Sequence, residues 1–102
     1  MITEIQSREE FASLTESGKV LVEFYSKTCG PCKMLAFVLK DVDKALDNPS
    51  IVVVDFDEYT DLKEQYDVKG FPTMLMLKDG QEVQRMQGLK QKRAIIEMIE
   101  NA

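Results

Sequence analysis

The sequence predicts an α/β domain whose central mixed β-sheet is flanked by helices on both faces. Short apolar runs typical of buried strands alternate with longer segments in which apolar residues recur at helical spacing. Alternation of this kind is characteristic of α/β proteins. A hairpin signal, Asp79-Gly80, follows the last buried run and predicts an antiparallel strand at one edge of the sheet. The 102 residues contain no linker or repeat, so we expect one domain over residues 1–102.

The first expected elements are a short helix and a buried strand. Ser7, with Glu10 three residues later, has the form of a capping box that starts a helix, and Gly18 ends it. The run Val20–Tyr25 is nearly continuously apolar, as in a strand with both faces buried. Glu23 interrupts this run, so the sequence places a carboxylate inside a core strand.

A turn and a long helix are expected next. Thr28–Cys32 forms the turn, and Pro31 suits the first turn of a helix, where the missing N–H of proline is no loss. From Lys33 onward a long amphipathic helix is indicated by apolar residues at helical spacing, namely Leu35, Val38, Val42 and Leu46. Asn48-Pro49 ends this helix.

The second half of the chain supplies the remaining strands and helices. The expected strands are Ile51–Phe56, Thr73–Leu77 and Glu82–Gln87, the last at the sheet edge. The expected helices are a short one from Tyr59 or Thr60 to about Val68–Gly70, and a final one over Lys90–Glu100 with Ile95, Ile96 and Ile99 facing inward. We expect the three buried strands to be mainly parallel and joined by right-handed crossovers.

The charge of the chain excludes some classes of partner. The net charge is −5, whereas a nucleic-acid-binding protein normally carries a basic patch. The basic residues Lys90, Lys92 and Arg93 are interpreted as the solvated face of a helix. We therefore expect neither a nucleic acid nor an anionic membrane as partner. No apolar run reaches the ~20 residues of a membrane span, and residues 1–10 do not resemble a signal peptide, so the expected location is cytoplasmic.

Two other residue groups are interpreted as structural. The acidic residues Asp55, Asp57, Glu58 and Asp61 lack the turn glycine of a calcium loop, so we expect a solvated cluster and no metal site. Met74 and Met76 alternate with apolar residues along one strand, which favours core packing over a soft-metal site.

The two cysteines, Cys29 and Cys32, carry the main functional signal. A structural disulfide would gain little from closing so short a loop. A structural zinc site usually needs four ligands, and the chain has no His and no second cysteine pair. A lone C-x-x-C pair in a reducing compartment therefore favours redox chemistry. Two inert neighbouring cysteines, or half of a metal site, remain the alternatives.

The position of the pair suits thiol–disulfide exchange. Cys29 lies where a strand gives way to a helix, and the positive end of a helix dipole lowers the pKa of a thiol. Lys27 and Lys33 flank the motif and add positive charge. We expect the Cys29 thiolate to attack a substrate disulfide, after which Cys32 attacks Cys29 and releases the reduced substrate.

Glu23 is the candidate proton acceptor for the second step. Cys32 lies further into the helix and is expected to be the more buried thiol, so it must lose a proton before it attacks. Burial would raise the pKa of Glu23 toward neutrality, which suits a general base. The alternative is that Glu23 lies on an exposed part of its strand.

These residues resemble the thioredoxin family over nearly the whole chain. The resemblance rests on Cys29-Gly30-Pro31-Cys32, on Pro72-Thr73 about forty residues later, and on the matching positions Phe24, Lys33, Asp57, Gly70, Phe71, Lys78, Asp79, Gly80 and Gly88. It favours thioredoxin over glutaredoxin and implies the thioredoxin fold and a protein-disulfide reductase. It further implies no prosthetic group, disulfide-containing proteins as substrates, and a thioredoxin reductase as electron donor. With no exceptional apolar stripe in the sequence, a monomer is expected.

The resemblance also implies a substrate-binding groove beside the cysteines. It predicts a cis peptide bond between Phe71 and Pro72, with the backbone from Gly70 to Pro72 pairing with an extended substrate segment. Gly88 would line the same groove. Gly30 lets a partner backbone approach closely, Pro31 stiffens the turn, and Thr28 lies immediately before the first cysteine.

Three departures from the family pattern concern this site. Thr28 stands where the family usually has Trp, Glu23 where it usually has Asp, and Val53 where a Lys commonly neighbours the acid. The missing Trp supports one rival hypothesis, a binding module that uses the fold as a scaffold. A second rival is a dedicated partner of one reductase or peroxidase system.

Overall fold

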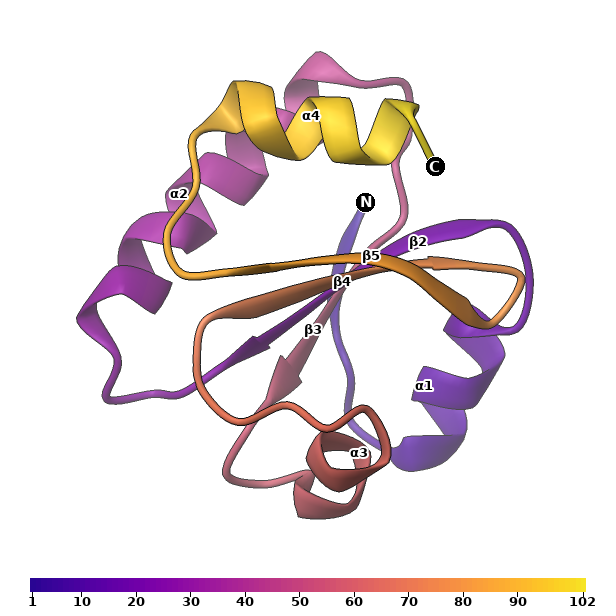
Figure 1. Cartoon of the computed structure of the whole chain (residues 1–102), viewed down its shortest axis with the longest axis vertical. Helices are drawn as coiled ribbons and strands as arrows, with labels where there is room; N and C mark the ends of the chain where they lie inside the picture. Colours follow the sequence, from indigo (N-terminus) through magenta and orange to yellow (C-terminus); the bar gives the residue numbers. More distant parts are fainter.

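Five strands form one mixed sheet in the order β1-β3-β2-β4-β5 in the computed structural model, which describes residues 1–102 (Figure 1). The strands are β1 (Ile2–Glu4), β2 (Lys19–Tyr25), β3 (Ile51–Asp55), β4 (Thr73–Lys78) and β5 (Gln81–Gln87). The helices are α1 (Arg8–Thr15), α2 (Gly30–Ala45), α3 (Thr60–Gln65) and α4 (Lys92–Glu100). None of the helices combines the length and apolar character needed to cross a membrane.

Helices cover both faces of the sheet, as predicted. In Figure 1, α2 and α4 lie on one side of the strands and α1 and α3 on the other. Alternate residues of each strand point to opposite faces. Leu21 therefore packs in the core beneath α2 and α4, whereas Val22 packs in the core beneath α1 and α3. Met74 and Met76 lie in the α2 and α4 core, which confirms their structural interpretation.

The prediction that the three buried strands are mainly parallel was wrong for β4. Strands β2 and β3 are parallel, but β4 pairs with β2 in the antiparallel direction. The six residues of α3 rise only about 9 Å, less than the ~20 Å length of a six-residue strand. The chain therefore stays at the end of the sheet where β3 finishes, and Thr73 starts β4 beside Phe24.

Two further details differ from the sequence prediction. Residues Ile2–Glu4 form β1, which pairs in parallel with β3, although no strand was expected there. In α4 the fully buried residues are Ile95 and Met98, whereas Ile96 and Ile99 are only partly buried. Half of the capping box predicted at Ser7 is present: the Ser7 Oγ accepts a hydrogen bond from the N–H of Glu10 at 3.0 Å, whereas the Glu10 carboxylate accepts one from the N–H of Gln6 at 2.8 Å.

Candidate functional site

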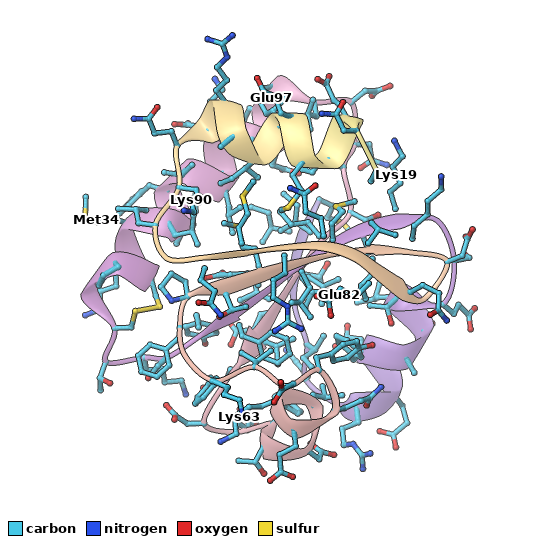
Figure 2. The ribbon with its side chains drawn as sticks, viewed as in Figure 1. Lys19, Met34, Lys63, Glu82, Lys90 and Glu97 are labelled. Atoms are coloured by element: carbon cyan, nitrogen blue, oxygen red, sulfur yellow. A yellow bond between two sulfur atoms is a disulfide. The ribbon has the colours of Figure 1, made fainter.

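A disulfide joins Cys29 and Cys32 at the beginning of α2. Figure 2 shows it as a yellow bond near the lower end of that helix. Cys29 is the N-cap of α2, and its Sγ accepts a hydrogen bond from the N–H of Cys32 at 3.1 Å. The two Cα atoms are 5.2 Å apart, within the usual range for a disulfide. The sulfurs thus lie where the helix directs free N–H groups and the positive end of its dipole.

Both cysteines are buried in the oxidised state. The exposed fraction is 6% for Cys29 and 4% for Cys32. Cys32 was expected to be the more buried of the two, and in the oxidised state the difference is very small. Thr28, Gly30 and Pro31 surround them, and all three of these residues are exposed. The exposed turn therefore offers backbone to a partner, while the sulfurs lie below the surface.

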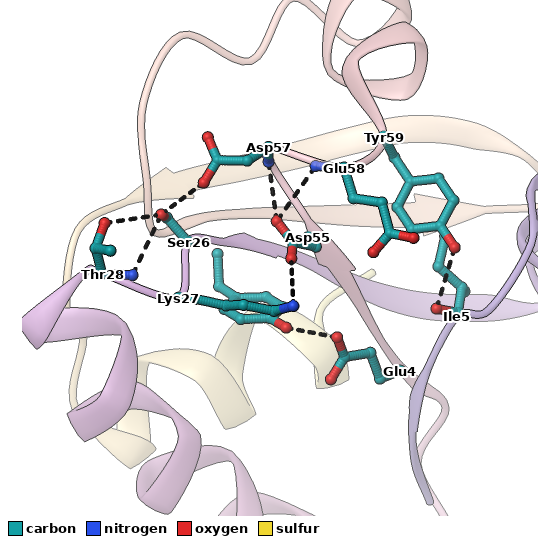
Figure 3. A network of polar contacts seen from close by, with 10 residues as sticks. Glu4, Ile5, Ser26, Lys27, Thr28, Asp55, Asp57, Glu58 and Tyr59 are labelled. Carbon is teal, nitrogen blue, oxygen red and sulfur yellow. Dashed lines mark hydrogen bonds and ion pairs between the residues drawn. The ribbon is translucent and has the colours of Figure 1, made fainter.

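The loop before Cys29 is held by a polar network (Figure 3). Ser26 donates a hydrogen bond from its Oγ to Asp57 at 2.8 Å and lies 3.3 Å from the Thr28 hydroxyl. The backbone carbonyl of Ser26 accepts a hydrogen bond from the N–H of Cys29 at 3.1 Å. The residues that precede the cysteine are thereby connected to the loop that follows β3.

Asp55 was expected in a solvated acidic cluster, and this was wrong. Its exposed fraction is 4%, and its carboxylate accepts a 2.9 Å hydrogen bond from the N–H of Asp57 and a 3.4 Å one from the N–H of Glu58. The ammonium group of Lys27 lies 3.7 Å from the same carboxylate. The positive charge of Lys27, which was expected to act on the cysteine thiols, therefore also balances the negative charge of the buried Asp55.

Glu23 is buried, with an exposed fraction of 3%. Its strand neighbours are Val53 on β3 and Met74 on β4, and neither offers a hydrogen-bond partner through its side chain. The Glu23 Oε2 atom has no hydrogen-bond partner. Burial, and to a smaller degree the negative charge of Glu4, raise the pKa of Glu23 to about 7. The burial expected from the sequence is therefore present.

Glu23 and Cys32 face a common cavity of about 230 Å³ between the sheet and α2. Most of its lining is apolar, and it is formed by Ile2, Glu4, Glu23, Tyr25, Cys32, Ala36, Leu39, Lys40 and Val53. The two residues that the sequence paired therefore line one cavity, on β2 and α2 respectively.

Glu4 and Tyr25 line the same cavity and were not recognised from the sequence. The Tyr25 hydroxyl donates a hydrogen bond to Glu4 Oε2, with 2.5 Å between the two oxygens. Tyr25 stands two residues after Glu23 and so shares its face of β2. The alternation of residues along β2 was the only sequence signal that could have placed Tyr25 beside Glu23. Glu4 had no such signal, because no strand was expected at β1.

The strand register brings Pro72 and Gly88 to the end of the sheet from which β2 leads to Cys29. Thr73, next to Pro72, pairs with Phe24 on one side and with Gln87 on the other. The peptide bond between Phe71 and Pro72 is cis. The N–H of Gly88 donates a hydrogen bond to the Pro72 carbonyl at 2.8 Å, and Gly88 has a φ of 84°, in the region that favours glycine.

Gly70 and Phe71 continue this segment. The Gly70 carbonyl accepts a hydrogen bond from the Thr73 hydroxyl at 2.8 Å. Phe71 is 42% exposed, and its ring packs edge-on against the ring of Phe56, with the ring centres 5.2 Å apart. No cluster of three or more Cys, Asp or Glu side chains is arranged to hold a metal ion.

The sequence matches the Thioredoxin family model over residues 2–101. It is 42% identical over 98 residues to the thioredoxin of Chlamydia trachomatis serovar D, covering 96% of each chain. It is 40% identical over 92 residues to the thioredoxin of Bacillus subtilis, covering 89% of this chain and 88% of that one.

Solved structures of similar proteins have the same fold. A mutant thioredoxin from Halobacterium salinarum superposes with a TM-score of 0.90 at 31% identity, covering 98% of this chain and 88% of that one. The oxidised form of mitochondrial thioredoxin 3 from Saccharomyces cerevisiae gives a TM-score of 0.86 at 29% identity, covering 99% and 95%.

Proposed function

The chain belongs to the thioredoxin family, and on that premise we propose that it reduces protein disulfides with Cys29 as the nucleophile and Cys32 as the resolving thiol. The family, the thioredoxin fold and the activity of a thiol–disulfide oxidoreductase, all predicted from the sequence, are confirmed. The observation that carries the assignment of roles is the position of Cys29 as N-cap of α2, joined to Cys32 by a disulfide.

In the first step the reduced Cys29 attacks one sulfur of a substrate disulfide. The Cys29 Sγ forms a new S–S bond, the substrate S–S bond breaks, and the leaving substrate sulfur takes the electron pair as a thiolate. The helix N-terminus favours the thiolate form of Cys29, and the N–H of Cys32, which contacts Sγ in the oxidised state, would stabilise that charge.

In the second step Cys32 resolves the mixed disulfide. Glu23 accepts the Cys32 proton, and the resulting thiolate attacks Cys29 Sγ. The bond between Cys29 and the substrate breaks, and the second substrate sulfur leaves with the electron pair. A pKa of about 7 supports this role for Glu23, because a base of that strength both accepts and returns a proton at neutral pH.

Substrate binding involves the turn around the cysteines and the segment beside it. We assign Thr28, Gly30 and Pro31 on one side, and Gly70, Phe71, Pro72 and Gly88 on the other, to contact with an extended segment of the substrate. The exposure of Phe71 supports this assignment, as does the register that puts Pro72 and Gly88 at the same end of the sheet as the cysteines.

The partners follow from the chemistry. Members of the family act on disulfide-containing proteins and are reduced by a thioredoxin reductase, and we assign both classes of partner to this chain. No cofactor beyond the Cys29–Cys32 disulfide is required. We also propose a monomeric domain spanning residues 1–102 and a cytoplasmic location, since a dithiol reductant works in a reducing compartment.

Reduction of a protein disulfide with dithiothreitol as terminal reductant tests this function. The substrate thiols are trapped by alkylation, and the rates are compared for the unmodified protein, Cys29→Ser and Cys32→Ser. We expect the unmodified protein to accelerate the reaction and both variants to lose that acceleration. A Cys29→Ser variant that lacks this activity but keeps its full biological role would instead support a binding module. That alternative is favoured by Thr28, which stands where the family usually has Trp.

A further inference from the structure

Two carboxylates lie in one row across the sheet beneath α2. Glu4 on β1 pairs with Val53 on β3, and Val53 pairs with Glu23 on β2. Adjacent strands lie about 4.8 Å apart, so the backbones at Glu4 and Glu23 are separated by about 10 Å. Both side chains line the cavity that Cys32 also faces. Glu4 is exposed and Glu23 is buried, so the two carboxylates occupy the outer and inner parts of one site.

We propose that Glu4, held by Tyr25, is a positioning residue that makes Glu23 a stronger proton acceptor for Cys32. The inference rests on the proposed function of Glu23 in the resolving step. Glu4 does not touch the reacting sulfurs. It acts through Glu23, because a nearby negative charge favours the protonated form of a second carboxylate.

No other group around Glu23 neutralises the effect of the Glu4 charge. Val53 and Met74 flank Glu23 on β3 and β4 and are uncharged. From α2 the cavity is faced by Cys32 and by Lys40, the one basic residue in its lining. The Lys40 ammonium group lies 5.5 Å from the centre of the ring of Phe37, an exposed residue, so its charge is directed along the outside of the helix.

Tyr25 fixes the position of the Glu4 carboxylate. Its hydroxyl donates a hydrogen bond to Glu4 Oε2, and its side chain stands on the same face of β2 as Glu23. Burial and the neighbouring carboxylates raise the pKa of Tyr25, so it remains a hydrogen-bond donor throughout the neutral range. An exposed glutamate that would otherwise sample many rotamers is thereby kept at the cavity.

Titration of the Glu23 side-chain carboxyl carbon by NMR tests the proposal in the oxidised protein. We expect Glu4→Gln to lower the midpoint by about 0.3 to 1.2 pH units, the range for a charge ~10 Å away at an effective dielectric constant between about 80 and 20. Glu4→Asp should restore most of the shift. Glu64→Gln is the matched control, because it removes the same charge from α3, on the opposite face of the sheet (Figure 1), and should leave the midpoint unchanged.

The salt dependence of the unmodified protein gives a second test that needs no variant. The exposed Glu4 charge is screened by salt, so the Glu23 midpoint should fall between about 0.01 M and 1 M salt. The fall should be smaller in Glu4→Gln. An unchanged midpoint in both tests would overturn the proposal.

The pH profile of the resolving step separates this inference from the proposed function. In Glu4→Gln, the midpoint of substrate release from the mixed disulfide should fall together with the Glu23 midpoint. If neither moves, while Glu23→Gln still slows release, the coupling to Glu4 is refuted and the role of Glu23 stands. If the Glu23 midpoint moves but the release profile does not, the role of Glu23 as proton acceptor fails, and the inference fails with it.

Discussion

Val53 lies directly beside Glu23 on the neighbouring strand, so the buried carboxylate has no cation next to it on β3. The Glu23 Oε2 atom has no hydrogen-bond partner, and its pKa is raised to about 7. The family commonly places a Lys at the position of Val53. In this chain the protonation of Glu23 is therefore governed by burial and by the carboxylate of Glu4, which has consequences for both stability and catalysis.

Glu23→Gln should stabilise the oxidised protein at alkaline pH. In the unfolded chain Glu23 loses its proton near pH 4.5, whereas in the folded protein it keeps the proton up to about pH 7. The contribution of Glu23 to the free energy of unfolding is therefore fully present below about pH 4.5 and is lost as the pH rises to about 7 and beyond. The loss amounts to about 3 kcal/mol. Urea unfolding from pH 4 to 9 measures it.

The two proteins should be nearly equally stable at pH 4, and the variant should be the more stable by up to about 3 kcal/mol at pH 9. A stability difference that does not depend on pH would contradict the raised pKa of Glu23.

Val53→Lys should lower the pKa of Glu23. The residue is half-buried at the same cavity, so its ammonium group can reach both Glu23 and solvent. An opposite charge within ~4–6 Å lowers the pKa of a carboxyl group by about one to three pH units. The carboxyl titration by NMR measures this change. Val53→Met is the control of similar length, and it should leave the midpoint near pH 7.

Cys32→Ser should trap the substrate on Cys29. The first step needs only Cys29, and without the resolving thiol the mixed disulfide persists. Mass spectrometry after reaction of the reduced variant with a disulfide peptide should find one covalent adduct. Cys29→Ser should give little adduct under the same conditions. The reverse pattern would assign the nucleophile to Cys32.

Gly88→Ala should destabilise the protein and slow substrate reduction. A side chain at a φ of 84° costs about 1–2 kcal/mol, which corresponds to a fall in Tm of several degrees for a domain of this size. Any backbone shift would also disturb the 2.8 Å hydrogen bond from the Gly88 N–H to Pro72. Gly70→Ala is the control for the loss of stability, because a Cβ there meets no atom within 4 Å and φ is not in the left-handed region. Equal losses in both variants would argue against a special role for Gly88.

Much of the fold could be predicted because its signals are local. The strand Val20–Tyr25 and the helix after Pro31 are set by apolar periodicity and by turn residues, and the structure places both within one to three residues of the prediction. The burial of Glu23 was predictable for the same reason, since a residue within a nearly continuous apolar strand has few ways to reach solvent.

The remaining features depend on contacts between distant segments. A three-residue strand such as Ile2–Glu4 is too short to show alternation, and it is defined only by pairing with β3. The direction of β4 is set by the short reach of α3, which no local pattern of the strand encodes. Asp55 was expected in solvent, but it is buried beside the loop that follows β2, where the ammonium group of Lys27 lies 3.7 Å from its carboxylate.

The site shows the same division. The C-x-x-C spacing is a local signal, and it identified Cys29 and Cys32 directly. The pairing of Tyr25 with Glu4 joins two strands that are not neighbours in the sheet, so it emerged only from the structure.

The redox equilibrium of Cys29 and Cys32 against glutathione or dithiothreitol, with thiols trapped at each point, tests the central claim most directly. A disulfide reductant of this family should show a single two-electron transition near the thioredoxin value of about −270 mV. A transition tens of millivolts less negative, toward the range of oxidants and isomerases, would contradict the assignment as a reductant. The absence of any intramolecular disulfide would contradict the oxidoreductase itself.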